Sequence, residues 1–312
     1  MDNILISCAG GPAAVGAIKS LKDINFKGKI ITIDCDPLSV GGFLGDQNYV
    51  VPLSTDKSYW GAVLKIIKSE NINIIIPTGD SDIKHFAQNK NILESSGVKV
   101  FMSDYKDIIR CQDKFIFFKD CFEKFPIPFT STNYKDLKFP MFAKPKQGSG
   151  SRGAKLCYKV SDIRTLDKEK SIHRSSEYIF QEFLPGREYT VDVFCGLDSI
   201  PYNVVIRERL QVKAGISSKG KIIINPFIER ICKELCVYLN LKGPICIQLK
   251  EDKYGSPKII EVNPRLGGGT YFSTLSGVNF LDLILKYCKG ESIPNIKPKE
   301  ITVLRYYNEI IA

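Results

Sequence analysis

The chain has 312 residues, enough to bury the cores of two or three compact units, and this length excludes a single small module. Hydrophobic residues make up 44% and charged residues 25%, so the composition excludes an intrinsically disordered chain. The formal net charge is +10, but the lysines are scattered singly among Asp, Glu and Asn. This pattern argues against a nucleic-acid partner and favours a modest attraction for anionic substrates.

The cysteines and the amino-terminal residues indicate the cellular compartment in which the protein is expected. Ten cysteines occur without a C-x-x-C pair, and Cys232 and Cys236 share one predicted helix as core residues. No apolar run approaches the roughly 20 residues of a membrane-spanning helix. The start, Ile4-Leu5-Ile6, is strand-like and unlike a signal peptide. We expect a cytoplasmic protein without a membrane partner, and we interpret its two histidines, His85 and His173, as structural or surface residues.

The first hundred residues alternate short apolar runs with longer amphipathic ones, which is typical of β-α-β units on a parallel sheet. Strands are predicted at 3–8, 29–34, 73–77 and 98–102, and helices at 13–22, 58–70 and 81–96. These elements predict an open α/β domain.

The remainder of the chain is predicted to be α+β. A helical pattern over 104–125 ends at Pro126 and Pro128, and a domain boundary is expected near 108–112. The elements predicted after it are strands at 139–145, 154–159, 177–183, 187–195 and 200–207, a helix at 226–240, a hairpin of strands 244–251 and 258–262, and a helix at 278–289.

A strand-end lysine, Lys144, precedes a glycine-rich hairpin that spans Gly148 to Gly153. Glycines let backbone N–H groups approach phosphate oxygens, and lysine supplies a point charge. The G-K-[ST] ending of a P-loop is missing, and the next segment is predicted to be a strand. The segment is therefore either a phosphate-binding loop or an ordinary β-turn.

A second polar cluster lies about a hundred residues later. Alternation places Glu261 and Asn263 on one face of a strand, and the hairpin brings Gln248 opposite them. Three oxygen donors that converge in this way suit Mg²⁺, with ATP completing the ligand set, and Arg265 follows with a planar donor fork suited to phosphate. The alternative is a polar strand end that bonds its own turn.

A third segment, 181–193, consists of two strand runs joined by a Pro-Gly turn. An adenine needs an apolar slot beside exposed backbone groups, and a ribose needs a carboxylate for its hydroxyls. Glu188, just past the turn, is placed to serve the ribose.

The order of these motifs resembles the ATP-grasp superfamily, most closely the carbamoyl-phosphate synthase large-chain type, in which segments similar to Glu261-Val262-Asn263-Pro264-Arg265 occur. The resemblance covers nearly the whole chain. It implies a Rossmann-like pre-ATP-grasp domain at 1–110, followed by a two-lobed ATP-grasp fold with a small lobe at 111–182 and a C-terminal lobe with the metal site at 183–312.

The resemblance also implies roles for individual residues. Lys114 and Lys144 would bind ATP phosphates, and Arg265 and Lys213 would serve the transferring phosphoryl group and the nucleotide, although Lys213 stands where the family often has a histidine. The other implied nucleotide-binding residues are Gly148, Ser149, Gly150, Ser151 and Gly153 in the loop, Gln181, Glu182, Phe183 and Leu184 at the adenine slot, and Glu188 on the ribose. Gln248, Glu261 and Asn263 would hold one or two Mg²⁺ ions, with Mn²⁺ as a substitute.

The implied activity is an ATP-dependent carboxylate–amine or carboxylate–thiol ligase that acts through an acyl phosphate on small-molecule substrates. Alternatives are a split subunit of a carbamoyl-phosphate synthase and a nucleotide-binding regulatory protein. A dinucleotide enzyme is disfavoured because Gly10, Gly11 and Gly16 do not fit the G-x-G-x-x-G spacing before Asp34.

The acceptor of the phosphoryl group is the least defined part. Residues 267–276 follow Arg265 and are expected to face it as a flexible loop. Arg207 and Arg209 are either a clamp for a carboxylate or solvated charges on an edge strand. A homodimer is the default expectation for the assembly.

Overall fold

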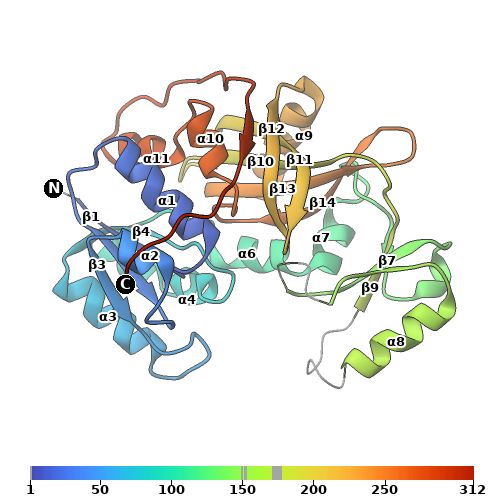
Figure 1. Ribbon diagram of the computed structural model, residues 1–312, viewed down its shortest axis with the longest axis horizontal. Helices are drawn as coiled ribbons and strands as arrows, with labels where there is room; N and C mark the ends of the chain where they lie inside the picture. The colour runs from blue at the N-terminus through green and yellow to red at the C-terminus, as the bar shows by residue number, and fades with distance from the viewer. Residues whose placement is uncertain (1, 149, 151–152, 171–177) are drawn as a thin grey trace.

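The computed structural model describes residues 2–148, 150, 153–170 and 178–312. Three sheets organise this part of the chain: a five-stranded parallel sheet, a four-stranded antiparallel sheet and a six-stranded antiparallel sheet. The five-stranded sheet and the four-stranded sheet lie at opposite ends of the molecule, and the six-stranded sheet lies between them (Figure 1). The predicted combination of an α/β domain with an α+β region is confirmed.

The N-terminal domain is built on the parallel sheet, whose strand order is β3-β2-β1-β4-β5. Its strands are β1 (Asn3–Ser7), β2 (Ile30–Asp34), β3 (Gln47–Val50), β4 (Ile72–Ile76) and β5 (Lys99–Val100). Its helices are α1 (Pro12–Asp23), α2 (Val40–Leu44), α3 (Tyr59–Ser69), α4 (Ile83–Gln88) and α5 (Lys90–Ser95). The central strands β1 and β4 are mostly apolar because helices cover both faces of a parallel sheet. His85 packs against the Tyr59 ring and its Nε2 lies 2.7 Å from the Ser54 carbonyl, so it is structural.

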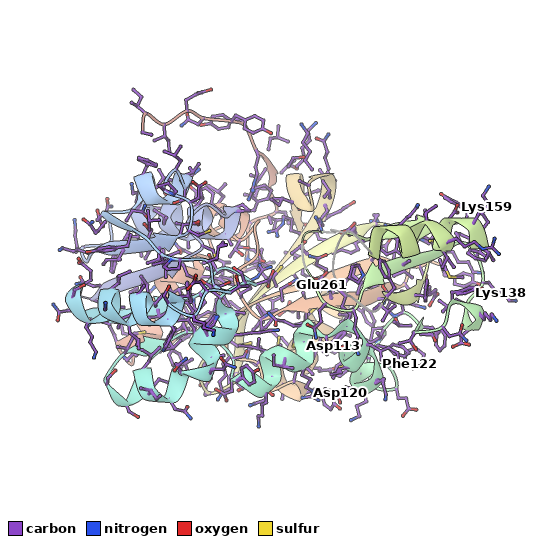
Figure 2. The ribbon with its side chains drawn as sticks, turned by 90° about the horizontal axis from the view of Figure 1, so that it is seen from below. Asp113, Asp120, Phe122, Lys138, Lys159 and Glu261 are labelled. Carbon is purple, nitrogen blue, oxygen red and sulfur yellow. The ribbon has the colours of Figure 1, made fainter. Side chains whose placement is uncertain are left out.

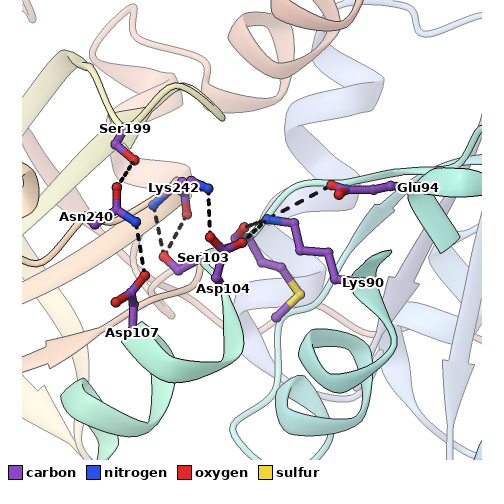
Figure 3. A network of polar contacts seen from close by, with 9 residues as sticks. Lys90, Glu94, Ser103, Asp104, Asp107, Ser199, Asn240 and Lys242 are labelled. Carbon is purple, nitrogen blue, oxygen red and sulfur yellow. Dashed lines mark hydrogen bonds and ion pairs between the residues drawn. The ribbon is translucent and has the colours of Figure 1, made fainter. Parts of the chain in front are cut away.

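Two helices, α6 (Tyr105–Gln112) and α7 (Lys114–Cys121), lead from this domain into the rest of the chain. A polar network fixes the junction, as Figure 3 shows. Asp104 accepts hydrogen bonds from Lys90 Nζ (2.8 Å) and from Lys242 Nζ (2.7 Å), and these ion pairs hold the pKa of Asp104 below its ordinary value despite partial burial. Ser103 Oγ accepts from the Lys242 backbone N–H at 2.9 Å. The C-terminal lobe is thereby tied to the start of α6.

The small lobe carries the antiparallel sheet of order β6-β9-β7-β8. Its elements are β6 (Thr130–Ser131), the short 3-10 helix Tyr134–Asp136, β7 (Met141–Pro145), β8 (Lys155–Cys157), α8 (Val160–Lys170) and β9 (Tyr178–Glu182). Met141, Ala143, Ile163, Leu166 and Phe180 belong to a hydrophobic core of its own.

The C-terminal lobe carries the six-stranded sheet of order β14-β13-β10-β11-β12-β15. Its strands are β10 (Glu188–Cys195), β11 (Pro201–Lys213), β12 (Ile216–Ile223), β13 (Gly243–Glu251), β14 (Pro257–Asn263) and β15 (Thr302–Leu304). Its helices are α9 (Pro226–Tyr238), α10 (Tyr271–Leu275) and α11 (Phe280–Cys288). Cys232 and Cys236 are fully buried in α9, as predicted, within the core that α9 forms with β10 and β13.

The N-terminal domain and the C-terminal lobe share one core. Ile4, Ile6 and Ile18 of the first domain pack in the same cluster as Phe272 and Phe280 of the last. These two parts therefore behave as a single body, because separating them would expose apolar surface.

Several helices and strands were not predicted from the sequence, and others differ from the prediction in extent or type. The predicted helix at 81–96 is two helices, α4 and α5, and the pattern over 104–125 is likewise two, α6 and α7. The flexible loop expected at 267–276 contains α10. The other elements not foreseen are α2, β3, β6, the 3-10 helix Tyr134–Asp136, α8, β12 and β15. Within the described ranges, no helix is long and apolar enough to cross a membrane.

Candidate active site

A cavity of about 540 Å³ lies where the N-terminal domain, the small lobe and the C-terminal lobe meet. Turns at the carboxyl ends of β1 and β4 form one wall, the glycine-rich turn after β7 forms another, and the six-stranded sheet forms the floor. Glu261, on that floor, lies near the centre of the molecule (Figure 2). Most of the predicted site residues that the structure describes line this one cavity.

Lys144 at the end of β7 is buried, and its ammonium group is fixed by other side chains. Its Nζ donates to Gln181 Oε1 at 2.9 Å and to the Ile260 carbonyl at 3.2 Å. Gln181 in turn donates from Nε2 to Thr130 Oγ1 at 2.9 Å, which sets the orientation of its amide. Burial lowers the pKa of Lys144 to about 8, while the Glu261 carboxylate opposes this shift.

Lys114, the first residue of α7, is tied to the glycine-rich turn. Its Nζ donates to the Gly148 carbonyl at 2.7 Å, and its backbone N–H donates to Lys146 O at 3.0 Å. Gly148 and Gly150 have φ of 133° and 68°, backbone conformations that favour glycine. Gly153 has φ of 73° and packs on Pro145 without lining the cavity. Ser149 and Ser151 lie outside the described residues.

The expected adenine slot is formed by the chain between β9 and β10. Glu182, Phe183 and Leu184 line the cavity, and Leu184 is buried. The Glu182 carboxylate accepts two hydrogen bonds from Lys258 Nζ, at 2.9 and 2.8 Å, and one from the Phe129 backbone N–H at 3.3 Å. The slot thus offers an apolar surface beside backbone groups, and the Glu182 carboxylate is already paired with Lys258. These properties suit an uncharged heterocycle.

Arg209 contacts the carboxylate that we expected to bind ribose. Its Nη1 donates to Glu188 Oε1 at 2.6 Å and lies 3.4 Å from Gln248 Oε1, and its Nη2 donates to the Gly215 carbonyl at 2.7 Å. Arg209 therefore joins the wall of the cavity, between Glu188 and Gln248. It is not a solvated charge on an edge strand, because β11 lies between β10 and β12.

The three predicted metal ligands share one face of the β13–β14 hairpin. Gln248 pairs with Glu261 and Cys246 pairs with Asn263, so the predicted hairpin register is present. Among the residues that the structure describes, no hydrogen bond or ion pair involves the side chains of Glu261 or Asn263. A free carboxylate and a free amide beside Gln248 supply the hard oxygen ligands that Mg²⁺ prefers, so these residues fit the ion.

Arg265 spans the cavity to the N-terminal domain. Its Nε donates to Asp80 Oδ1 at 2.7 Å, and its Nη2 contacts Asp80 Oδ2 in the bidentate arrangement. Burial would lower the pKa of Arg265, but Asp80 holds it above its ordinary value. Asp80, which follows β4, is absent from the predicted site residues because nothing in one sequence pairs it with Arg265.

Two expectations are corrected. Lys213 is exposed at the end of β11 and does not line the cavity, although Val212, Ala214 and Gly215 beside it do. Arg207 is neither solvated nor a clamp for a carboxylate: it is 1% exposed and ion-paired with Asp192.

The turn after β1 does not form a dinucleotide site. Asp34 accepts hydrogen bonds from the Gly10 N–H (2.8 Å) and from the Asp36 N–H (2.9 Å), so its carboxylate is occupied within the protein. Gly11 and Pro12 line the central cavity instead.

The chain thus has a two-lobed region behind an α/β domain, and cationic side chains and side-chain oxygens face one another across one cavity. Comparison with protein families agrees. Residues 174–310 match a family described as ATP-grasp in the biosynthetic pathway with Ter operon, and residues 4–101 match the PylC-like N-terminal domain. The chain thus contains an ATP-grasp domain that is preceded by a PylC-like N-terminal domain.

Individual relatives are distant. The carbamoyl phosphate synthase large chain of Campylobacter jejuni is 22% identical over 281 residues, which cover 84% of this chain and 25% of the relative. The chain thus spans about a quarter of the length of the carbamoyl phosphate synthase large chains that it matches.

Solved structures share the fold. Biotin carboxylase of Campylobacter jejuni, in a complex described as β,γ-ATP, aligns with a TM-score of 0.72 at 16% identity over 94% of this chain and 72% of the other. The L-amino acid ligase of Bacillus licheniformis aligns with a TM-score of 0.70 at 16% identity over 96% and 78%.

Proposed function

We propose that this protein is an ATP-dependent carboxylate–amine ligase, with a thiol as an alternative nucleophile, that acts through an acyl phosphate and releases ADP and phosphate. The observation that carries the proposal is the convergence of Lys114, Lys144 and Arg265 on the same cavity as Gln248, Glu261 and Asn263. The cations match the phosphates of ATP, and the free oxygens match a metal that neutralises those phosphates.

The proposed division of labour follows from the positions of the side chains. Lys144 and Lys114 hold the phosphate chain, and the turn at Gly148 and Gly150 offers backbone groups without side chains in the way. Gln248, Glu261 and Asn263 hold Mg²⁺, which supplies charge neutralisation at the phosphates when bound. Arg265, oriented by Asp80, faces the group that is transferred.

In the proposed reaction a substrate carboxylate oxygen attacks the γ-phosphorus and ADP leaves, which gives an acyl phosphate. The nitrogen of an amine then attacks the acyl carbon, phosphate leaves, and the nitrogen loses its proton to solvent. Positioning and charge stabilisation carry this chemistry, so no protein acid–base pair is required.

The relatives support this class without fixing the substrates. The names of the relatives include an L-amino acid ligase and a D-alanine–D-alanine ligase, both of which join carboxylates to amines. Small-molecule substrates and a homodimer are part of the same proposal.

The test is release of ADP and phosphate from Mg-ATP by purified protein with a pool of carboxylic acids, in the presence and absence of a pool of amines. The expected result is release that depends on an acid and rises with an amine. Lys144→Ala is expected to abolish it, and Glu261→Gln is expected to lower it at an unchanged Mg²⁺ concentration.

Other outcomes would identify the alternatives. ATP binding without any release would favour a binding role or a subunit that needs a partner, as in a split carbamoyl-phosphate synthase. Absence of ATP binding would refute the assignment of the cavity.

A further inference from the structure

The loop Gly267–Thr270 forms the side of the cavity that faces the N-terminal domain. Gly267 and Gly268 line the cavity directly after Arg265, and α10 begins at Tyr271. A Cβ at Gly268 would lie 3.1 Å from Pro12 Cγ, so the loop closes against the first turn of α1. On the proposed function, this is the side on which the phosphoryl acceptor enters, because the loop directly follows Arg265, whereas the expected adenine slot lies between β9 and β10.

A buried carboxylate, Asp192 on β10, lies beneath this loop. It is 1% exposed, and its Oδ2 accepts from Arg207 Nη1 at 3.0 Å and from Ser273 Oγ at 2.8 Å. Its Oδ1 lies 3.3 Å from Thr270 Oγ1. Thr270 Oγ1 also accepts from the Gly267 N–H at 2.9 Å. Asp192 therefore connects the sheet to both ends of the loop.

Arg207 holds the loop from the same side. Its Nη1 donates to the Gly269 carbonyl at 2.8 Å, and a Cβ at Gly269 would lie 2.5 Å from its Nη2. The guanidinium carbon lies 5.4 Å from the centroid of the Phe272 ring. Arg305 packs on that ring at 5.1 Å and contacts the Gly268 carbonyl.

We propose that Asp192, together with Arg207 and Thr270, positions the Gly267–Thr270 loop for binding of the phosphoryl acceptor. None of the three lines the cavity, so each acts through the loop backbone. A buried ion pair stabilises a fold only weakly, but it fixes one geometry because leaving either charge unpaired is costly. The buried charges of Asp192 and Arg207 thus hold the Gly267–Thr270 loop in one position relative to the six-stranded sheet.

The experiment uses Thr270→Val, which keeps the shape of the side chain and removes the hydroxyl, and Thr270→Ser, which keeps the hydroxyl. Thr32→Val is the matched control, because Thr32 is also buried and donates to Asn48 Oδ1 at 2.9 Å, in the N-terminal domain. The carboxylic acid from the pool that gives the fastest ADP release by the unmodified protein serves as the probe.

For Thr270→Val we expect KM for this acid to rise at least tenfold, while KM for ATP and kcat stay within about twofold. Thr270→Ser and Thr32→Val should match the unmodified protein. A general loss of folding would instead move all three constants, and unchanged KM for the acid in Thr270→Val would overturn the proposal.

The outcome is separable from that of the proposed function. If no acid supports ADP release by the unmodified protein, the positioning role is still tested by amide hydrogen exchange of the peptide that contains the loop. Exchange at least tenfold faster in Thr270→Val, but not in Thr270→Ser or Thr32→Val, would support the positioning role, and equal exchange in all four proteins would overturn it.

Discussion

Replacement of Lys144 by Met gives the sharpest test of the phosphate side of the site. Burial lowers the pKa of Lys144 from 10.5 to about 8, which corresponds to about 3 kcal/mol against the charged form. In the nucleotide-free protein the unfolded chain holds the proton between pH 8 and 10.5, so folding stability gains as pH rises over that range. Bound phosphate favours the ammonium form of Lys144 and so opposes the preference of the buried side chain for its neutral form.

Affinity for a non-hydrolysable ATP analogue should therefore fall as pH rises through about 8. A group of this pKa is roughly 90% protonated at pH 7 and roughly 10% protonated at pH 9, so binding should weaken about tenfold between these values. Calorimetric titration with the Mg²⁺ complex of the analogue measures the dissociation constant at each pH.

Lys144→Met should bind more weakly at pH 7 and lose this pH dependence. Lys250→Met, which changes another lysine that lines the cavity, should retain it because Lys144 is still present. Equal pH dependence in the unmodified protein and in Lys144→Met would refute the assignment of Lys144 to the phosphates.

Three further substitutions test other parts of the site, and a fourth, Gly61→Ala in α3, is a control outside it. Glu261→Gln should raise the Mg²⁺ concentration needed for half-maximal ADP release at least tenfold, with an unchanged circular dichroism spectrum, because it removes the one carboxylate of the oxygen set. Arg265→Lys loses the bidentate contact to Asp80 and should lower kcat for ADP release about 100-fold, with ATP affinity within a few fold by calorimetry. Gly79→Ala would place a Cβ 2.1 Å from Cys8 Sγ and should cost about 1–3 kcal/mol in thermal unfolding, whereas Gly61→Ala, in open space within α3, should stabilise by up to about 1 kcal/mol.

The parts of the fold that follow local patterns could be predicted from the sequence. The parallel strands β1, β2 and β4 are short and mostly apolar, and α9 shows the helical spacing of Ile228, Ile231 and Leu235. The helix α8 was missed although Ile163 and Leu166 give it a buried face, because its other residues are mostly polar. The strand β12 is also polar in sequence, and its conformation depends on pairing with β11 and β15.

The site divides in the same way. The residues that motif order identifies, such as Lys144, Gln181 and Glu261, do line one cavity. Residues whose roles depend on distant partners were missed or misread. Arg207 resembles a surface charge until Asp192, fifteen positions earlier, is seen beneath it, and Asp80 has no role until Arg265, 185 positions later, reaches it. Pairings across this separation leave no mark on local spacing.

The distribution of cores indicates which part of the site can move. The N-terminal domain and the C-terminal lobe share one hydrophobic cluster, so Asp80 and Arg265 are held in fixed relation to Glu261. The small lobe has a separate hydrophobic core, and Lys144 lies on strand β7 of this lobe. A hydrogen bond of 3.2 Å from Lys144 Nζ to the Ile260 carbonyl connects this lobe to β14 beside the metal ligands. We therefore expect any opening of the cavity to move the small lobe as a unit, because this leaves the shared cluster intact, and to carry Lys144 away from Glu261.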